Sequence, residues 1–381
     1  MNILKNLILI AYILSLFIET KCDSIYDYSK NAQFLGMQNT LPEKNYYTLV
    51  NKSINSGKIE FKLKRSEKNK FKNFNPNQLK LVNSVNLEIV FVSKNTFQFI
   101  FRDGETERFE QPHKELFPYH KNKIPIEDDF DFKLSNLGLE YDFKIIENPF
   151  SLEISRKSTK EIVFSTKNHD FFFGENYGEF TAEIPSANLF GLGERTTTFR
   201  LKSGIYTLYN KDLYGEIEDG KGQGKNRYGS HPMYLMREKS GNYHITYLRN
   251  TFPMDVILDF PSANKFTRRR RIGKKNLITY KVVGGVFDFS IFFGNENPEN
   301  SIELYHKFLG GWSLTPFWSM GFHQCRWGYK NLSFIKQVLK GYKDNSIPMD
   351  TIWMDIDYMN DYQPFTVDEN RYDLNEFKTV L

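Results

Sequence analysis

Short runs in which hydrophobic and polar residues alternate occupy the chain from about Tyr46 to Phe293. In one of them, Leu152 and Ile154 alternate with Glu153 and Ser155, a period of two that is typical of a strand with one buried face. The β-rich runs are separated by Gly, Asn and Asp, and the clearest cover residues 86–104, 150–166, 241–260 and 276–294. They predict an antiparallel β-sandwich of roughly 250 residues.

The pattern changes near Asn295–Asn300, after which residues 301–311 have helical spacing. A buried strand is predicted at Trp318–Cys325, an amphipathic helix at Ser333–Asn345 and a second buried strand at Thr351–Ile356. The apolar face of that helix comprises Phe334, Ile335, Val338, Leu339 and Tyr342, and Asn331 and Ser333 are the candidate N-caps. This order predicts one β-α-β unit, the start of a parallel sheet or of a (β/α)₈ barrel. Such a barrel needs ~250 residues, so we expect the chain to stop inside a domain.

The first 22 residues have the features of a secretory signal peptide. Lys5 precedes an apolar stretch, Leu7–Ile18, and cleavage is expected after Cys22. The stretch is shorter than the ~20 residues that span a bilayer, so an uncleaved anchor is the weaker alternative. We expect a signal peptide at 1–22, a sandwich domain at 23–300 and an incomplete barrel at 301–381. The expected destination is the secretory pathway, either lysosomal or vacuolar, or secreted, with no membrane span after cleavage.

Composition supports a folded chain, with 40% hydrophobic and 16% aromatic residues among 381. Cys22 and Cys325 are the two cysteines, so signal cleavage would leave no internal disulfide, and Cys325 is expected to be a buried, inert thiol. Two triplets, at residues 51–53 and 331–333, match the N-glycosylation acceptor pattern and fit a lumenal protein.

The net charge of +5 includes two basic runs, Lys62–Lys72 and Arg268–Arg271. No zinc spacing, stacking motif or basic helix accompanies them. We therefore interpret them as solvated segments and expect no nucleic-acid partner.

The most polar strand end follows the second predicted strand, in "TIWMDIDYMND". Strand alternation would place Trp353, Asp355 and Asp357 on one face, at the carboxyl end of a parallel strand, and Trp327 would lie on the same rim. A carboxylate beside an indole suits a sugar, because the acid accepts hydroxyl hydrogens and the ring covers the apolar face of the pyranose.

Three other interpretations of this stretch stay open from the residues alone. An acid and nucleophile pair is disfavoured, because residues two apart on a strand lie ~6.6 Å apart along one side, whereas glycosidic cleavage needs two carboxyl groups that flank the bond. A divalent metal site would lack further ligands. A polar strand end with capping aspartates is the simplest alternative.

Several long motifs resemble, in one order, those of family 31 of the glycoside hydrolases, the α-glucosidase family. They are "FRDGETERFEQP", "PFSLEISRKSTKEIVFST", "LFGLGERTTTFRLKSGIYTLYNKD", "YGSHPMYL", "GGVFDFSIFFG", "SMGFHQCRWGY" and "IPMDTIWMDIDYMNDYQPFTVD". The resemblance begins near residue 40 and covers nearly all of the chain after it.

The resemblance implies a galactose-mutarotase-like sandwich followed by a catalytic (β/α)₈ barrel. It also implies an exo-acting, retaining α-glucosidase that releases terminal glucose from an α-glucoside oligosaccharide. It identifies Asp355 as a ligand of the sugar hydroxyls, Trp327 as a wall of the site and Asp212 as a contribution from a sandwich loop. No metal or organic cofactor is implied, since two carboxylates suffice for the reaction.

The family's nucleophile stands in a W-x-D-M-N-E segment, which is absent from these 381 residues, as is the segment of its acid/base. No catalytic residue is therefore assigned, and this chain alone is expected to be inactive. The alternative is a non-catalytic carbohydrate-binding protein built on the sandwich.

Three smaller features have structural interpretations. "FGLGER", residues 190–195, is expected to be a tight turn rather than a nucleotide loop, because it lacks the further glycine and the lysine. His231 and His323 have no partners at metal-ligand spacing. His323 is expected to make ordinary hydrogen bonds, and His231 to support the loop of Asp212.

Overall fold

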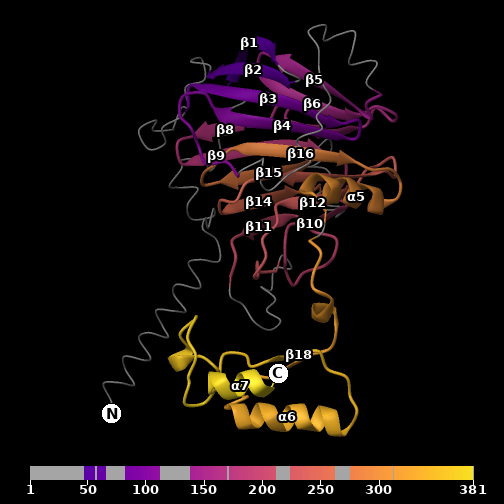
Figure 1. Ribbon diagram of the computed structural model, residues 1–381. Coiled ribbons are helices and arrows are strands. Elements are labelled where there is room, and N and C mark those ends of the chain that lie inside the picture. The colour runs from indigo at the N-terminus through magenta and orange to yellow at the C-terminus, as the bar shows by residue number, and fades with distance from the viewer. Residues whose placement is uncertain are drawn as a thin grey trace. The chain divides into compact units, whose positions relative to one another are not determined.

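The computed structural model describes residues 47–55, 58–65, 82–111, 138–169, 171–211, 224–261, 275–311 and 313–380 (Figure 1). Its contacts divide the chain into two compact units, Met1–Gly311 and Trp312–Leu381, each described by itself below.

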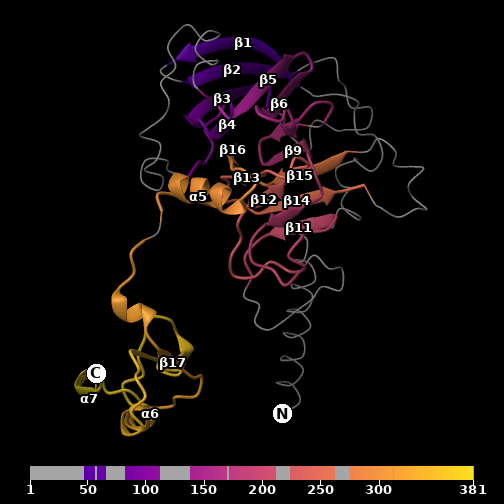
Figure 2. The ribbon, with the colours of Figure 1, turned by 90° about the vertical axis from the view of Figure 1, so that its right-hand side faces the viewer.

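The first unit is a sandwich of two antiparallel sheets, which face each other in Figures 1 and 2. The described strands of the first sheet run in the order β1 (Tyr47–Asn55), β2 (Lys58–Arg65), β3 (Ser84–Ser93), β4 (Thr96–Asp103), β16 (Phe287–Phe293), β13 (Tyr243–Leu248), β12 (Met233–Arg237) and β10 (Leu189–Gly191). Those of the second sheet run in the order β11 (Gly204–Leu208), β14 (Met254–Asp259), β15 (Asn276–Val282), β9 (Tyr177–Ile184), β7 (Ile162–Ser165), β6 (Phe150–Arg156) and β5 (Tyr141–Glu147), with β8 (Phe171–Gly174) beside β9. The predicted antiparallel sandwich is confirmed.

The four β-rich runs supply eight of these strands in two different ways. Strands β3 and β4 pair with each other, as do β6 and β7. In contrast, β13 and β14 lie in different sheets, and so do β15 and β16. Each of these two later runs therefore crosses from one sheet to the other, which joins the sheets covalently as well as by packing.

Phenylalanine side chains form the layer between the two sheets. Phe97, Phe99 and Phe101 alternate along β4 and are buried, as the period of a strand requires. Phe289 of β16 contacts Phe99 within the first sheet and Phe180 of the second sheet, at ring-centroid distances of 5.1 and 5.0 Å. Such tilted and offset aromatic pairs add to the free energy of area burial.

Helix α5 (Pro298–Leu309) covers part of the outer face of the first sheet (Figure 2). The Asn297 side chain caps its first turn by accepting the Glu299 N–H at 3.0 Å, and Gly310 ends it with φ 94°, a conformation that favours glycine. Tyr305 and Phe308 are buried against Phe292 of β16, with ring centroids 5.5 and 5.2 Å away. These contacts place the predicted helix with the sandwich.

A buried ionic cluster ties the second sheet to the first. The Arg156 guanidinium on β6 donates two hydrogen bonds to the Glu238 carboxylate, at 2.8 and 2.7 Å, and Glu238 follows β12 directly. His244 Nδ1 on β13 lies 2.8 Å from the same carboxylate. Burial alone would raise the pKa of Glu238, but the hydrogen bonds from Arg156 and His244 lower it to about 2.

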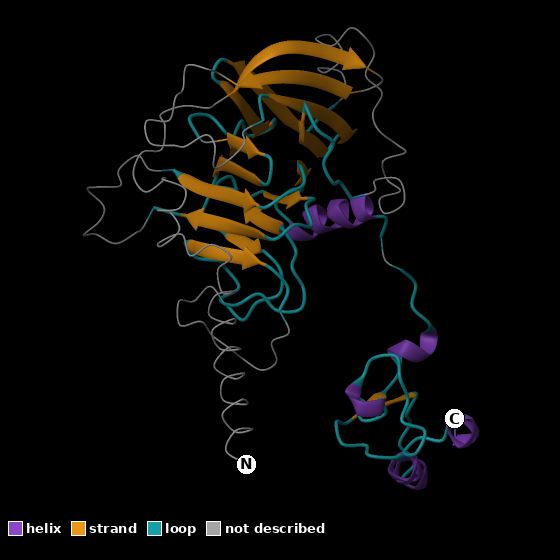
Figure 3. Cartoon of the chain, turned by 90° about the vertical axis from the view of Figure 1, so that its left-hand side faces the viewer, coloured by secondary structure: helices purple, strands orange, loops and turns teal. Residues whose placement is uncertain are grey.

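The second unit contains the predicted β-α-β order. Figure 3 shows its helices and its short strands. Strand β17 (His323–Cys325) pairs in parallel with β18 (Thr351–Trp353), and α6 (Leu332–Asp344) connects them. Asn331, one of the two predicted N-caps, accepts the Phe334 N–H at 2.9 Å. Ile335 of α6 is fully buried in a cluster that includes Ile352 of β18. Shorter helical segments are η3 (Phe317–Met320), η4 (Asn360–Tyr362) and α7 (Leu374–Val380).

The two strands of this unit are shorter and more exposed than predicted. Residues 317–320 form the 3-10 turn η3 in place of a strand, because the Pro316 carbonyl accepts both the backbone N–H and the hydroxyl of Ser319. Trp318 is 57% exposed. Cys325 is exposed too, so the prediction of a buried thiol was wrong. The second strand ends at Trp353, three residues before the predicted end.

The predicted signal peptide and the Arg268–Arg271 run lie outside the described residues. Among the helices that the structure describes, none has both the length and the hydropathy needed to cross a bilayer.

Replacing Phe289 with Ala should lower the free energy of unfolding by about 3–5 kcal/mol, because a fully buried ring between the sheets would leave a cavity. Urea unfolding of the chain would measure it. Phe199→Ala is the control, since the Phe199 ring is 85% exposed and should cost less than about 0.5 kcal/mol. Equal losses in the two variants would contradict a core centred on Phe289.

Replacing Glu238 with Gln should cost about 3–5 kcal/mol at neutral pH, because Arg156 would keep its buried charge without a counter-charge. The pKa of Glu238 is depressed in the folded chain, so its contribution is complete above pH 4.5 and falls as the pH drops toward about 2. Urea unfolding at pH 7 and pH 3 should show that the difference between wild type and Glu238→Gln shrinks in acid. Glu147→Gln, at an exposed position, should show no such difference.

Candidate functional site

Trp327 and Asp355 occupy equivalent places after two neighbouring parallel strands. Cys325 and Trp353 are the last paired residues of β17 and β18, and Trp327 and Asp355 each lie two positions beyond. Carboxyl ends of paired parallel strands meet at one edge of a sheet, so both residues belong to the same edge, as predicted. Trp327 is 70% exposed, and Asp355 is exposed as well.

The orientation of Asp355 does not follow strand alternation. Its φ of 56° lies in the left-handed region, which aspartate tolerates better than most residues, and its Oδ1 accepts the Ile356 N–H at 2.8 Å. This turn stops β18 and corrects the prediction that Trp353, Asp355 and Asp357 share one strand face. The Oδ2 atom of Asp355 has no hydrogen-bond partner in the described part of the chain, which leaves a carboxylate oxygen for a ligand hydroxyl.

Asp357 turns inward and holds the loop that carries Trp327. It is 6% exposed, and its Oδ2 accepts the Gly328 N–H at 2.6 Å. Gly328 has a φ of 116°, a conformation that side chains rarely adopt. The same loop is fixed next to Gly328, where the Tyr372 hydroxyl donates to the Tyr329 carbonyl. Asp357 therefore joins the ends of β17 and β18, a role that sequence reasoning missed because a strand pattern was assumed.

His323 makes the ordinary hydrogen bonds that were predicted. Its Nδ1 accepts from Trp353 Nε1 at 2.9 Å, and its Nε2 lies 3.0 Å from the Ser319 carbonyl. This arrangement fits a neutral ring with the proton on Nε2. The bond to Trp353 fixes an indole that is 55% exposed at the same strand end.

Asp212, the sandwich residue singled out by the sequence, lies outside the described residues. The backbone on both sides of residues 212–223 is described. Lys211 donates its N–H to the Arg227 carbonyl at 2.8 Å, and Arg227 donates to the Glu194 carbonyl at 3.0 Å. The segments before and after 212–223 therefore contact each other and the "FGLGER" turn.

Arg195, from that turn, joins these segments through one guanidinium. Its Nε donates to the Leu192 carbonyl at 3.1 Å and its Nη1 to the Gly224 carbonyl at 3.0 Å, while Nη2 donates to the Thr207 carbonyl. The guanidinium also lies over the Tyr206 ring, 5.3 Å from its centroid. Planar Arg can form such a fork, and Lys cannot. Sequence reasoning missed this role, although an Arg at the end of a glycine-rich turn could have indicated it.

The glycines of "FGLGER" form a tight turn, as predicted. A Cβ on Gly193, whose φ is 84°, would lie 3.0 Å from the His231 backbone nitrogen. The His231 ring points to another partner, since its Nε2 is 2.5 Å from the Tyr305 hydroxyl on α5. Burial lowers the pKa of His231, which favours the neutral ring. Its proposed support of Asp212 stays a prediction.

Arg195→Lys should weaken the contacts between the segments that precede and follow residues 212–223. A single ammonium cannot reach all three carbonyls, and each hydrogen bond to a charged donor contributes about 1.5–3 kcal/mol. Amide hydrogen exchange at Lys211 and Arg227 should accelerate about tenfold or more. Arg237→Lys, at an exposed position on β12, should leave both amides unchanged. Unchanged exchange in Arg195→Lys would show that the guanidinium does not hold these segments.

Comparisons with known proteins agree on one family. A model described as the glycosyl hydrolase 31 N-terminal galactose mutarotase-like domain matches residues 37–256, and one described as the glycosyl hydrolases family 31 TIM-barrel domain matches residues 312–381. Lysosomal acid alpha-glucosidase of Tetrahymena pyriformis is 40% identical over 304 residues, which are 79% of this chain and 30% of that protein. Glucoamylase 1 of Schwanniomyces occidentalis is 34% identical over 255 residues, 66% of this chain and 24% of that protein.

Solved structures show the same fold at low sequence identity. The glucosidase II alpha subunit, in its alpha3-Glc2-bound form, matches with a TM-score of 0.70 and 17% identity over 93% of this chain and 43% of that one. A family 31 dextranase of Flavobacterium johnsoniae complexed with isomaltotriose matches with a TM-score of 0.62 and 16% identity, over 88% and 37%. The chain thus spans less than half of each relative.

Proposed function

Because the chain belongs to glycosyl hydrolase family 31, we propose that the protein acts on α-linked glucose at the non-reducing end of α-glucoside oligosaccharides. The main support is the pairing of an exposed indole, Trp327, with a carboxylate that has a free oxygen, Asp355, at the ends of neighbouring parallel strands. Trp327 would cover the apolar face of a pyranose, and Asp355 would accept its hydroxyl hydrogens. By its match to the family motif, Asp212 is the third proposed substrate-binding residue.

The proposed reaction is hydrolysis with retention of configuration. A carboxylate attacks the anomeric carbon and breaks its bond to the glycosidic oxygen, which takes a proton from a second carboxyl group. Water then attacks the anomeric carbon of the covalent glycosyl-enzyme and gives up a proton to the second carboxylate. The bond from that carbon to the first carboxylate breaks, which releases glucose and restores the first carboxylate. The family's segments for these two groups are absent from residues 1–381. We therefore propose that these residues supply substrate-binding groups and no catalytic carboxylate, and that alone they release no glucose.

A secretory destination is proposed on two grounds. The first 22 residues have the composition of a signal peptide, and one relative is named a lysosomal enzyme. The proposed location is therefore a lysosome or vacuole, or the exterior of the cell.

The test begins by reading the transcript through the codon for Leu381 and expressing the complete reading frame that contains it. That product should release glucose from an α-glucoside, and Asp355→Ala should lower kcat/KM about 10- to 100-fold for each lost hydrogen bond. This estimate follows from ~1.5–3 kcal/mol for a bond to a charged group and 1.4 kcal/mol for each tenfold change.

Asp361→Ala, at another exposed aspartate of the same unit, is the matched control and should keep wild-type kcat/KM. Equal activity of both variants would refute the role of Asp355. A product that binds the glucoside without releasing glucose would favour the non-catalytic carbohydrate-binding alternative.

A further inference from the structure

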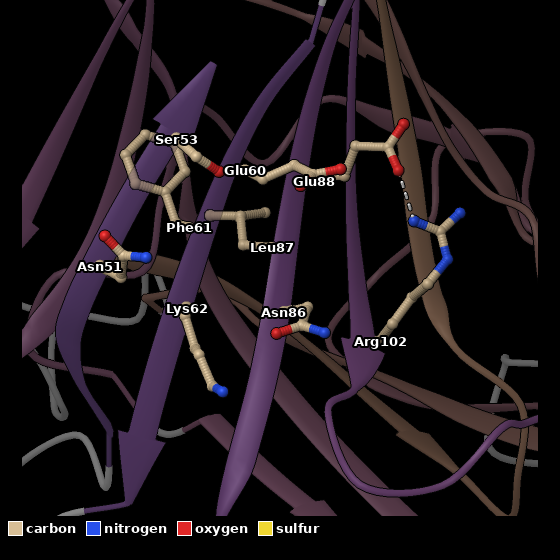
Figure 4. A pocket seen from close by; sticks show the side chains of 9 residues that line it. All are labelled: Asn51, Ser53, Glu60, Phe61, Lys62, Asn86, Leu87, Glu88 and Arg102. Atoms are coloured by element: carbon tan, nitrogen blue, oxygen red, sulfur yellow. Dashed lines mark hydrogen bonds and ion pairs between the residues drawn. The ribbon is translucent and has the colours of Figure 1, made fainter. Parts of the chain in front are cut away.

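The outer face of strands β1–β4 contains a polar groove of about 420 Å³, shown in Figure 4. One row of cross-strand pairs supplies Asn51, Lys62, Asn86 and Arg102, and the next row supplies Ser53, Glu60 and Glu88. We call this surface the β1–β4 groove. It belongs to the sandwich and lies outside the substrate-binding residues proposed above.

The groove is charge-balanced. Two carboxylates, Glu60 and Glu88, face two cations, Lys62 and Arg102. Glu88 is already paired with Arg102 at 2.7 Å and with Lys58 at 3.3 Å. The remaining lone pairs and N–H groups suit a neutral ligand with many hydroxyl and amide groups better than a phosphate or a cation.

Four polar side chains of the groove have no hydrogen-bond partner in the described part of the chain: Asn51, Ser53, Lys62 and Asn86. The aromatic residue that borders the groove, Phe61, is 4% exposed and offers no ring for stacking. A sugar would therefore be held by hydrogen bonds alone, and a free sugar would bind weakly. A covalent tether removes that weakness, because it gives an effective concentration in the millimolar range.

The sequence offers an attachment point for such a tether at the rim of the groove. Asn51-Lys52-Ser53 matches the N-glycosylation pattern. Asn51 is exposed, and both Asn51 and Ser53 line the groove, as residues two apart on a strand should. We propose that Asn51 carries an N-linked glycan whose first sugar residues lie in the β1–β4 groove. The inference rests on the proposed secretory destination and is independent of the hydrolytic activity.

The attachment needs a lipid pyrophosphate-linked oligosaccharide as the sugar donor. The Asn51 Nδ2 forms a bond to the anomeric carbon and loses one proton, the bond from that carbon to the pyrophosphate oxygen breaks, and the lipid pyrophosphate leaves. No redox change occurs.

The chain is expressed through the secretory pathway of a eukaryotic cell as the Ser333→Ala variant, which removes the triplet at 331–333 and keeps the Asn331 cap of helix α6. Residues 51–53 are then the remaining matching triplet of the two identified. Mass spectrometry of the secreted chain should find a glycan on Asn51, and Asn51→Gln and Ser53→Ala should each abolish it while Ser53→Thr keeps it. Enzymatic release of the glycan is then timed on the native chain.

The double variant Lys62→Ala, Asn86→Ala removes two side chains that would hold the sugar. It should accelerate enzymatic release of the glycan from the native chain about two- to tenfold, which corresponds to an effective sugar concentration of about one to ten times the dissociation constant of the sugar for the groove. The control Lys144→Ala, on β5, should leave the rate of glycan release unchanged. If the double variant is not secreted, Asn86→Ala alone is measured in its place. The inference is overturned if the secreted chain carries no glycan on Asn51, or if the glycan is released at the same rate from all variants. A chain that never enters the pathway overturns the proposed destination as well.

Discussion

The packing of the two sheets through one layer of phenylalanine rings is the interaction on which the larger unit depends. Phe99 and Phe289 of the first sheet and Phe180 of the second are fully buried and in contact. These rings must lie inward, and since strand side chains alternate, every second residue must lie outward. Polar residues at those positions make the outer face of β1–β4 a hydrophilic surface, and apolar ones under α5 form a second small core.

Two arginines add hydrogen bonds to this packing. The Arg156 guanidinium lies over the buried Phe293 ring, and that of Arg195 lies over the buried Tyr206 ring. Arg195 binds three backbone carbonyls around the base of the 212–223 segment, and Arg156 joins the sheets through Glu238. Both use the guanidinium fork to satisfy several acceptors at once, which suits positions where backbone carbonyls from distant segments converge.

Local periodicity was enough to predict eight strands of the sandwich, helix α6 and two candidates for its N-cap, of which Asn331 is the cap. It could not predict which strands pair across long separations, such as β4 with β16, because pairing depends on packing of the whole sandwich. The edge that carries Trp327 and Asp355 was predicted correctly. The orientation of Asp355 was not, because one left-handed residue breaks the alternation on which the prediction relied. Asp357, expected on the same strand face as Asp355, is buried for the same reason.

The proposed binding residues and the residues that hold them differ in physical character. Trp327 and Asp355 are exposed, and the folded chain gains little from burying them. Asp357 and Arg195, in contrast, satisfy backbone groups that would otherwise lack partners. Loss of an exposed binding residue should therefore reduce affinity and leave the fold intact. Loss of a holding residue should disturb local structure first and affinity through it, so kinetics and hydrogen exchange together separate the two roles.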